Sequence, residues 1–483
     1  MKFKIEPYRW QLDTLKKSRN LNNMAIFAEM GTGKTACQIN ILRDKYGLST
    51  KLLKTLIFSP LVTLYNWEEE ILKHSKITRD KIHVLSGTSK KKKSIFYNLS
   101  DDNGSLTKDG IAITNYETTL SKDFLAMVEE WDPEVLVLDE SHYVKNHKSK
   151  RFKAIREIAD RIRLKGGYVF IMTGTPILNS PIDVWAQYRI LDGGETLGDN
   201  FYVFRNIYFE DENAAWSNRD SHFAKFVPRI EKFEELNNKI YSKAVRVLKS
   251  ECLDLPPLVK ELRQVELNKE QKKAYKEMER DLLTFVKDKK DEMTASVANA
   301  VVVKALRLQQ IVSGFIKTED DEEISLGDVP RLKYTKELLS DLCVENKVIL
   351  WCSFRYNYKQ LGKICKDLGL EYVTITGDQT GSEKQEAVRA FNNDPNVKVC
   401  IGNRRAGGIG INLVSAAYSI VYSRNFSLGE ELQSEARNHR GGSQIHKQIV
   451  KIDLVAPETI DEKVLTALAN KQQISEVIID SFK

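Results

Sequence analysis

The stretch Asn23-Met-Ala-Ile-Phe-Ala-Glu-Met-Gly-Thr-Gly-Lys-Thr35 decides the fold of this 483-residue chain. Its first six residues form an apolar, β-prone run too short for a helix, and a helical pattern begins at Lys34. Between the two, glycines let backbone N–H groups fold around phosphate oxygens, Lys34 adds positive charge, and the Thr35 hydroxyl can bind Mg²⁺. Ala28 stands where the general pattern has glycine, and an incidental Gly-Lys-Thr turn is the alternative. The strand before the loop and the helix after it favour a nucleotide site.

Four further apolar runs repeat this alternation over the first half of the chain. Each ends in small or polar residues, and helical stretches rich in Lys and Glu separate them. Such a pattern requires right-handed crossovers and predicts a doubly wound, parallel α/β sheet with catalytic loops after its strand ends. The four runs are 55–59, 111–114, 135–139 and 168–173.

Two carboxylates, Asp139 and Glu140, follow the run at 135–139. An Asp-Glu pair at a strand end is by itself more often an exposed turn, but a phosphate loop in the same sheet favours a catalytic pair. Asp139 would then hold a metal through its water shell, and Glu140 would position and deprotonate the attacking water. Upstream, the amide of Gln11 both donates and accepts and would select adenine. A surface glutamine is the alternative for Gln11.

The pattern changes after about residue 193. Aromatic residues lie among charges without a clean strand as far as residue 264, which favours an irregular, mostly helical insertion. Two consecutive prolines at 256–257 indicate a break, because proline cannot continue a helix. A long helical region at 268–316 and an acidic, exposed loop at 319–330 follow.

From residue 331 the strand-like runs resume, which predicts a second α/β lobe. We therefore expect a first lobe at 1–195, a helical insertion and linker region at 196–330, and a second lobe at 331–483. The predicted strands of the second lobe are 347–352, 372–375, 397–401, 418–422 and 448–455.

Length and composition agree with a soluble protein of two or three domains. Hydrophobic residues make up 42% and charged residues 29%, which is typical of globular chains and excludes a disordered one. The net charge of +7 permits a polyanionic partner without requiring one. The six cysteines form no C-x-x-C pair, so a zinc site and a disulfide framework are not expected. Neither a signal peptide nor a membrane-spanning run is evident, which indicates an intracellular protein.

Together these motifs resemble superfamily-two helicase-like ATPases, specifically the SWI/SNF-type double-stranded DNA translocases. The resemblance spans about residues 5–469 and implies two RecA-like, doubly wound parallel-sheet lobes with helical insertions. Three departures stand out, at Ala436, at Gly442 and at 423–426. The stretches similar to family motifs are Ser59-Pro60 with Asn66-Trp67, 113–118, Asp139-Glu140-Ser141-His142, Thr173-Gly-Thr175-Pro176 with Asn179, 348–354, 406–413 and 433–444.

The resemblance also implies roles for residues of the second half. Arg437 and Arg440 are three apart, so on a helix both guanidinium groups would reach the γ-phosphate as arginine fingers. His142 would link hydrolysis to the motif at 173–176. ATP and Mg²⁺ are the expected cofactors, with Lys34, Asp139, Glu140, Arg437 and Arg440 catalytic and Thr35 and Asp139 at the metal. The expected nucleotide contacts are Gln11, Ala28, Met30, Gly31, Thr32, Gly33, Lys34, Thr35, Gly410 and Gln433.

The expected partner is duplex DNA, gripped mainly through the phosphates of one strand and therefore without sequence preference. Lys90-Lys-Lys-Lys93 could add a phosphate contact, although a flexible, solvated loop is favoured there. The aromatic residues at 201–216 could stack on bases, but packing of the insertion on the first lobe is favoured. The grips implied by the resemblance are Leu61, Thr114, Asn115, Ser353, Phe354, Gly407 and Asn412.

The expected function is a DNA-dependent ATPase that translocates on double-stranded DNA. A strand-separating DNA or RNA helicase of the same superfamily is one alternative. A non-hydrolysing DNA-binding module is the other, and the presence of all the catalytic residues argues against it. We expect a compact monomer of viral or bacterial type in the cytoplasm or nucleoid, without membrane attachment, targeted by a protein partner or by DNA structure itself.

Overall fold

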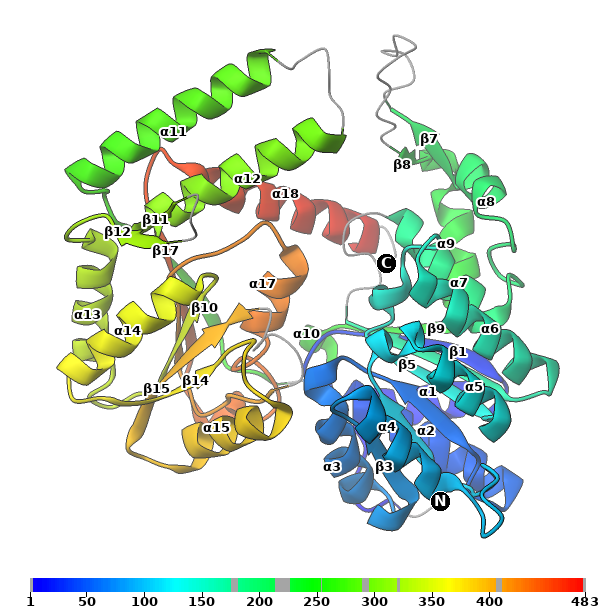
Figure 1. Ribbon diagram of the computed structural model, residues 1–483. Helices are drawn as coiled ribbons and strands as arrows, with labels where there is room; N and C mark the ends of the chain where they lie inside the picture. The colour runs from blue at the N-terminus through cyan, green and yellow to red at the C-terminus, as the bar shows by residue number, and fades with distance from the viewer. Residues whose placement is uncertain are drawn as a thin grey trace. The chain divides into compact units, whose positions relative to one another are not determined.

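The chain forms two compact units, each built on a parallel sheet (Figure 1). The computed structural model describes residues 3–174, 181–212, 226–252, 254–288, 295–318, 322–404 and 411–480. Among these, the first unit comprises the residues through Asp254 together with 479–480, and the second comprises those from Leu255 to Ile478. None of the helices in these ranges is both long and apolar enough to cross a membrane.

The first unit contains a seven-stranded sheet in the order β3-β4-β2-β5-β6-β1-β9, with every neighbouring pair parallel. The five predicted strands are confirmed, and β3 and β9 are additional. Both additional strands are short edge strands with two half-buried residues each, so their apolar signal is weak. The strands are β1 (Asn23–Ala28), β2 (Thr55–Phe58), β3 (Ile82–Leu85), β4 (Ile111–Thr114), β5 (Val135–Asp139), β6 (Tyr168–Thr173) and β9 (Ala244–Val247).

Helices cover both faces of this sheet. Alternate strand residues point to opposite faces, so Met24 and Ile26 join one buried cluster while Ala25 and Phe27 join the other. The first cluster includes residues of α1 (Arg9–Arg19), α2 (Lys34–Ser49) and α3 (Leu64–His74). The second includes residues of α5 (Lys122–Trp131), α6 (Lys150–Leu164), α7 (Val184–Asp192), α8 (Phe201–Tyr208) and α9 (Phe233–Ser242).

The predictions for the lysine run at 90–93 and for the aromatic stretch at 201–216 have different outcomes. The lysine run at 90–93 was expected to be a loop, but it lies in a helix, α4 (Ser89–Phe96). Thr88 caps this helix and Phe96 anchors it in the core, which explains why the run is ordered. The packing interpretation of the aromatic stretch is confirmed for Phe204 and Tyr208, which are buried in the first unit.

The second unit contains a six-stranded sheet in the order β10-β17-β16-β13-β15-β14, again with every neighbouring pair parallel. The five predicted strands are confirmed, so the α/β class with two doubly wound parallel sheets is correct. Strand β10 is additional, because three charged residues and little buried apolar surface hide it in the sequence. The strands are β10 (Leu258–Gln264), β13 (Val348–Cys352), β14 (Glu371–Ile375), β15 (Val397–Asn403), β16 (Tyr418–Val421) and β17 (Ile449–Val455).

Helices α13 (Pro330–Leu342) and α14 (Arg355–Asp367) pack on one face of this sheet, and α15 (Gly381–Asn393) packs on the other. The described part of the expected helical region at 268–316 contains α11 (Lys269–Asp288), α12 (Ala295–Val312) and the start of β11 (Phe315–Lys317). These helices share a separate apolar cluster with α18 (Ile460–Asp480).

The segment expected as one insertion and linker, 196–330, is divided between the two units. Its first part reaches the first sheet through β9, which pairs with β1. Its second part joins the second sheet through β10, which pairs with β17 over seven residues. The division falls at Asp254–Leu255, beside the proline break.

Candidate active site

The phosphate loop lies between β1 and α2. Gly31 and Gly33 have φ angles of +87° and +89°, a backbone conformation that residues with a side chain rarely adopt. A Cβ at Gly33 would also lie 2.8 Å from Gln11 Nε2. Because α2 begins at Lys34, its free N–H groups face the loop, as a phosphate site requires. Ala28 ends β1, Ala28, Met30 and Thr32 are buried, and Thr35 is half-buried.

Gln11 is buried against this loop. Its Nε2 donates to the Gly33 carbonyl at 3.0 Å, and its Oε1 accepts from the Tyr8 backbone N–H at 2.9 Å. The surface alternative for Gln11 is therefore wrong. The two bonds leave one amide hydrogen and one lone pair, so recognition of adenine by Gln11 stays a prediction.

The acidic pair lies at the end of β5 and meets the phosphate loop. Glu140 Oε1 lies 3.3 Å from Lys34 Nζ, and both carboxylates are buried. Glu140 has φ +54°, a left-handed conformation that a non-glycine residue adopts at a cost and that is frequent at functional sites. Parallel strands thus bring Lys34 and Glu140 together, as the sequence predicts.

A second set of contacts holds the other oxygen of Glu140. Thr173 Oγ1 donates to Glu140 Oε2 at 3.2 Å, and His142 Nδ1 lies 3.4 Å from the same oxygen. Burial acts to raise the pKa of Glu140, but Lys34 and the hydrogen bond from His142 outweigh it and hold that pKa well below its usual value. Glu140 is therefore an ionised acceptor. His142 also lies 3.3 Å from Thr173 Oγ1, which places it between the acidic pair and the motif that begins at Thr173. Thr175, Pro176 and Asn179 of that motif lie outside the described residues.

Asp139 presents two unequal oxygens. Oδ2 accepts from Ser59 Oγ and from Trp67 Nε1, each at 2.9 Å. Oδ1 is buried and has no hydrogen-bond partner within the described part of the chain. Burial and the neighbouring charge of Glu140 raise the pKa of Asp139. A buried carboxylate oxygen without a partner is costly, and a metal-bound water would satisfy it, so Asp139 with Thr35 fits Mg²⁺.

Glu29, inside the phosphate loop, contacts the end of the first unit. Its Oε2 accepts from the Lys249 backbone N–H at 2.7 Å, and its own N–H donates to the Val247 carbonyl at 3.0 Å. Lys249 begins the short helix α10 (Lys249–Cys252), which ends two residues before Asp254, the last residue before the division between the units. Sequence reasoning missed this contact, because no motif links the two segments.

The predicted DNA grips of the first unit differ in exposure. Thr114 is fully buried, and its hydroxyl donates to Thr118 Oγ1. Asn115 is 5% exposed, and its side chain bonds Lys92, Thr118 and Glu117. The side chains of Thr114 and Asn115 are thus buried and hydrogen-bonded to neighbouring side chains, whereas Leu61 is 55% exposed.

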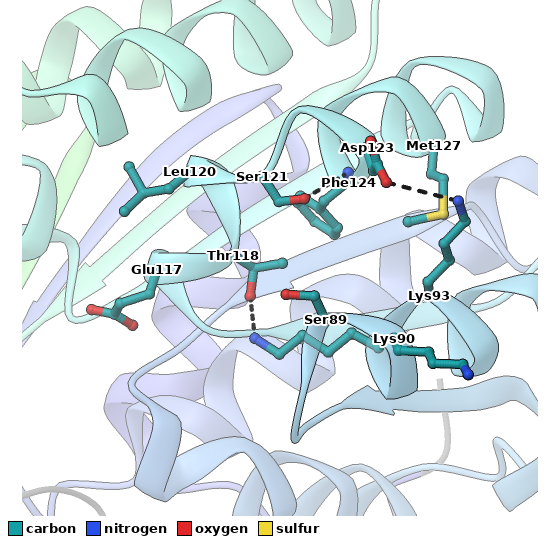
Figure 2. Close-up of a pocket in the computed structure, with 11 residues that line it drawn as sticks. Ser89, Lys90, Lys93, Glu117, Thr118, Leu120, Ser121, Asp123, Phe124 and Met127 are labelled. Carbon is teal, nitrogen blue, oxygen red and sulfur yellow. Dashed lines mark hydrogen bonds and ion pairs between the residues drawn. The ribbon is translucent and has the colours of Figure 1, made fainter.

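Helix α4 lines a pocket of about 700 Å³ beside this loop (Figure 2). Three lysines of α4, Lys90, Lys92 and Lys93, line this pocket together with the carboxylates Glu117 and Asp123. Lys92 Nζ donates to Asn115 and Thr118, each at 2.5 Å, and Lys93 lies 3.8 Å from Asp123. The lysine run is therefore built onto the loop that carries the predicted DNA grips.

The two predicted arginine fingers converge in the second unit. Arg437 and Arg440 each donate to the carbonyl of Ile411, at 3.0 and 3.2 Å. Both lie beyond α17 (Leu428–Glu435), so the prediction that a helix aligns them is wrong. A turn after the helix aligns them instead, tied by the Leu413 N–H to the Arg437 carbonyl.

The other predicted residues of the second unit differ in position and exposure. Gln433 is buried on α17, and its carbonyl accepts from Arg437 Nε. Ser353 and Phe354 follow β13 and are half-buried, whereas Asn412 is exposed. Gly407 and Gly410 lie outside the described residues.

A buried ionic network supports α17, and the sequence analysis did not identify it. Glu431 pairs with Arg404 and with Lys451, and Asp453 pairs with Arg424 at 2.7 Å. Burial acts to raise the pKa of Glu431, but Arg404 and Lys451 outweigh it and hold that pKa well below its usual value. The sequence does show two charged residues, Lys451 and Asp453, inside the apolar run at 448–455. This pattern does not identify the residues with which they pair.

Comparisons with known proteins identify the family of the chain. The family model described as SNF2-related domain matches residues 8–314, and the helicase conserved C-terminal domain matches residues 331–442. An uncharacterized ATP-dependent helicase of Mycoplasma genitalium is 26% identical over 92% of this chain and 39% of its own length. A CHD3-type chromatin-remodelling factor of Arabidopsis thaliana is 23% identical over 95% of this chain and 36% of its own length.

The chain thus spans about 40% of the length of the curated relatives it matches. Among solved structures, the Sulfolobus solfataricus SWI2/SNF2 ATPase core in complex with dsDNA is 23% identical. The match covers 99% of this chain and 94% of that one, with a TM-score of 0.42.

Proposed function

Because the chain belongs to the SNF2-related family and also carries the helicase C-terminal domain, we propose that it is an ATP-hydrolysing enzyme that translocates on duplex DNA. The family expected from the sequence motifs is confirmed by these matches. The observation that carries the proposal is the meeting at one sheet edge of Lys34, Glu140 and the Asp139 oxygen that has no partner among the described residues. Phosphate loop, base and metal-facing carboxylate are the groups that cleavage of a nucleoside triphosphate needs.

Lys34 and Glu140 would act in sequence. In the structure the ammonium of Lys34 neutralises the carboxylate of Glu140. Triphosphate in the loop attracts that ammonium, which leaves Glu140 with its hydrogen bonds from Thr173 and His142 and makes it a stronger base. Glu140 then takes a proton from the attacking water. Asp139 Oδ1 and Thr35 would hold Mg²⁺, which when bound neutralises phosphate charge.

Arg437 and Arg440 would complete the site by stabilising charge on the transferred phosphoryl group. Arginine fingers contribute roughly 10³–10⁵ to turnover. In this proposal the two guanidinium groups exchange the Ile411 carbonyl for phosphate oxygens. The neighbouring Asn412 is an exposed candidate for a DNA contact, so movement at Ile411 would reach the DNA grip.

Contact with DNA in the first unit would involve the lysines of α4. Four lysines occupy the first turns of this helix, where the helix dipole favours anions, so a DNA phosphate would stabilise the arrangement. Lys90 and Lys93 flank the pocket of Figure 2 and reach solvent. Relatives are named as chromatin-remodelling and DNA-binding helicases, which supports DNA as the partner.

The test is ATP turnover with duplex DNA, single-stranded DNA, RNA or no nucleic acid. We expect stimulation by duplex DNA of any sequence, weakening as salt increases. A variant with Lys90→Glu and Lys93→Glu should need more duplex for half-maximal stimulation, while the exposed control Lys153→Glu should not. Stimulation by single strands or RNA alone would contradict the proposal.

Strand separation is the second candidate, because two relatives are named ATP-dependent helicases. An oligonucleotide displacement assay discriminates the two candidates. A translocase turns over ATP on duplex DNA without releasing the annealed strand, whereas a strand-separating enzyme releases it.

A further inference from the structure

We propose that Trp67 is a positioning residue for the metal-facing carboxylate of Asp139. It would hold Asp139 so that Oδ1 faces the metal, in partnership with Ser59. This inference rests on the proposed hydrolysis of ATP and adds a residue that the phosphate-loop and acidic-pair patterns do not contain. The sequence places Trp67 in the stretch that resembles a family motif, Ser59-Pro60 with Asn66-Trp67, next to the DNA grip expected at Leu61. The indole of Trp67 nevertheless points into the protein.

The contacts of Asp139 are divided between its two oxygens. Trp67 is fully buried on α3, and its Nε1 donates to Asp139 Oδ2 at 2.9 Å. Ser59 directly follows β2, and its Oγ donates to the same oxygen, also at 2.9 Å. Oδ1 is buried and has no partner within the described ranges. The two donors therefore distinguish oxygens that are chemically equivalent in a free carboxylate.

This division fixes the rotation of the carboxylate. The terminal torsion of an aspartate side chain is soft and has two equivalent settings, so burial alone does not decide which oxygen faces outward. Two donors on one oxygen remove that freedom. The Tyr116 hydroxyl also donates to the Asp139 backbone carbonyl at 2.7 Å, which holds the main chain of the same residue. Only the orientation of the carboxylate group depends on Trp67 and Ser59.

The chemistry of the donors suits this role. An indole N–H only donates and does not titrate, so Trp67 favours an ionised acceptor at every physiological pH. Hydrogen-bond partners of this kind orient metal ligands, and their loss typically lowers metal affinity by 10–100-fold. We therefore expect Trp67 to act on the Mg²⁺ dependence of nucleotide binding more than on nucleotide binding itself.

The chain offers a matched control in Trp131. This residue is also fully buried in the first unit, and its Nε1 donates at 3.0 Å to the Lys108 backbone carbonyl. Trp131→Phe therefore removes the same ring atoms and one indole hydrogen bond, but none to a carboxylate. A difference between Trp67→Phe and Trp131→Phe isolates the contact with Asp139 from the cost of repacking the core.

The experiment measures binding of a fluorescent, non-hydrolysable ATP analogue to the full chain, first in EDTA and then during a Mg²⁺ titration. We expect Trp67→Phe to leave affinity in EDTA unchanged and to raise the Mg²⁺ concentration for half-maximal effect by about 10-fold or more. Trp131→Phe should match the wild type. Ser59→Ala should shift the Mg²⁺ dependence in the same direction, and it carries the test if Trp67→Phe does not fold.

Two results would contradict different claims. An unchanged Mg²⁺ midpoint in both Trp67→Phe and Ser59→Ala would overturn the positioning role and leave the proposed function intact. A wild-type protein whose nucleotide binding ignores Mg²⁺ would instead overturn the proposed function.

Discussion

Lys34 and Glu140 define the chemistry at the scale of single residues. Their contact of 3.3 Å joins the phosphate loop to the acidic pair, and it keeps Glu140 ionised despite burial. We predict that Glu140→Gln retains nucleotide binding, because the amide keeps the size of the side chain, while kcat falls by about 10²–10⁴ through loss of the base. Steady-state turnover and analogue binding measure the two effects. Near-normal turnover would show that another group is the base.

The second prediction at this scale concerns the conformation of Gly33 in the phosphate loop. Gly33→Ala forces a side chain onto φ +89° and places its Cβ 2.8 Å from Gln11 Nε2. The left-handed conformation alone costs about 1–2 kcal/mol, and displacement of Gln11 should weaken ATP binding. Gly47→Ala on α2 is the control, since nothing lies within 4 Å of that position. It should stabilise the protein by about 0.5–1 kcal/mol. Thermal unfolding and analogue binding separate the two effects, and normal binding by Gly33→Ala would refute the loop assignment.

Among the elements, α17 depends on the buried pairs that Glu431 makes with Arg404 and Lys451. Glu431→Gln leaves two buried cations without their partner, so we expect it to lower the free energy of unfolding by about 3–5 kcal/mol. Because the folded-state pKa of Glu431 lies below its ordinary value, its contribution is present above about pH 4.3 and is lost as pH falls. Chemical denaturation between pH 3 and 7 measures both effects. If the free energy of unfolding of the wild type falls no more steeply at acid pH than that of Glu431→Gln, this assignment is contradicted.

For the whole molecule, the proposal divides the chemistry between two units, each with its own sheet and core. Arg440→Ala should lower kcat by about 10³ while affinity for the ATP analogue stays within a few-fold, because the phosphate loop belongs to the first unit. Turnover and binding on the same preparation test this division. A loss confined to thermal stability would reduce Arg440 to a support of the Ile411 turn.

The sequence by itself determined the fold class, ten of the strands and the phosphate loop with its acidic pair. Local pattern suffices for these features, because a buried parallel strand reads as an apolar run and a phosphate loop requires glycines at fixed spacing. The proximity of Lys34 to Glu140 also followed, since parallel strands bring their carboxyl ends to one edge.

Only the tertiary structure decided which side chains form hydrogen bonds and ion pairs with the residues of these sites. Edge strands β9 and β10 carry too little apolar signal to be read, although they divide the segment at 196–330 between the units. Trp67 and Ser59 on Asp139, Glu29 on Lys249, and Arg404 on Glu431 join positions far apart in the chain. No local pattern specifies such pairs, because hydrogen bonds between distant residues depend on how the strands and helices pack.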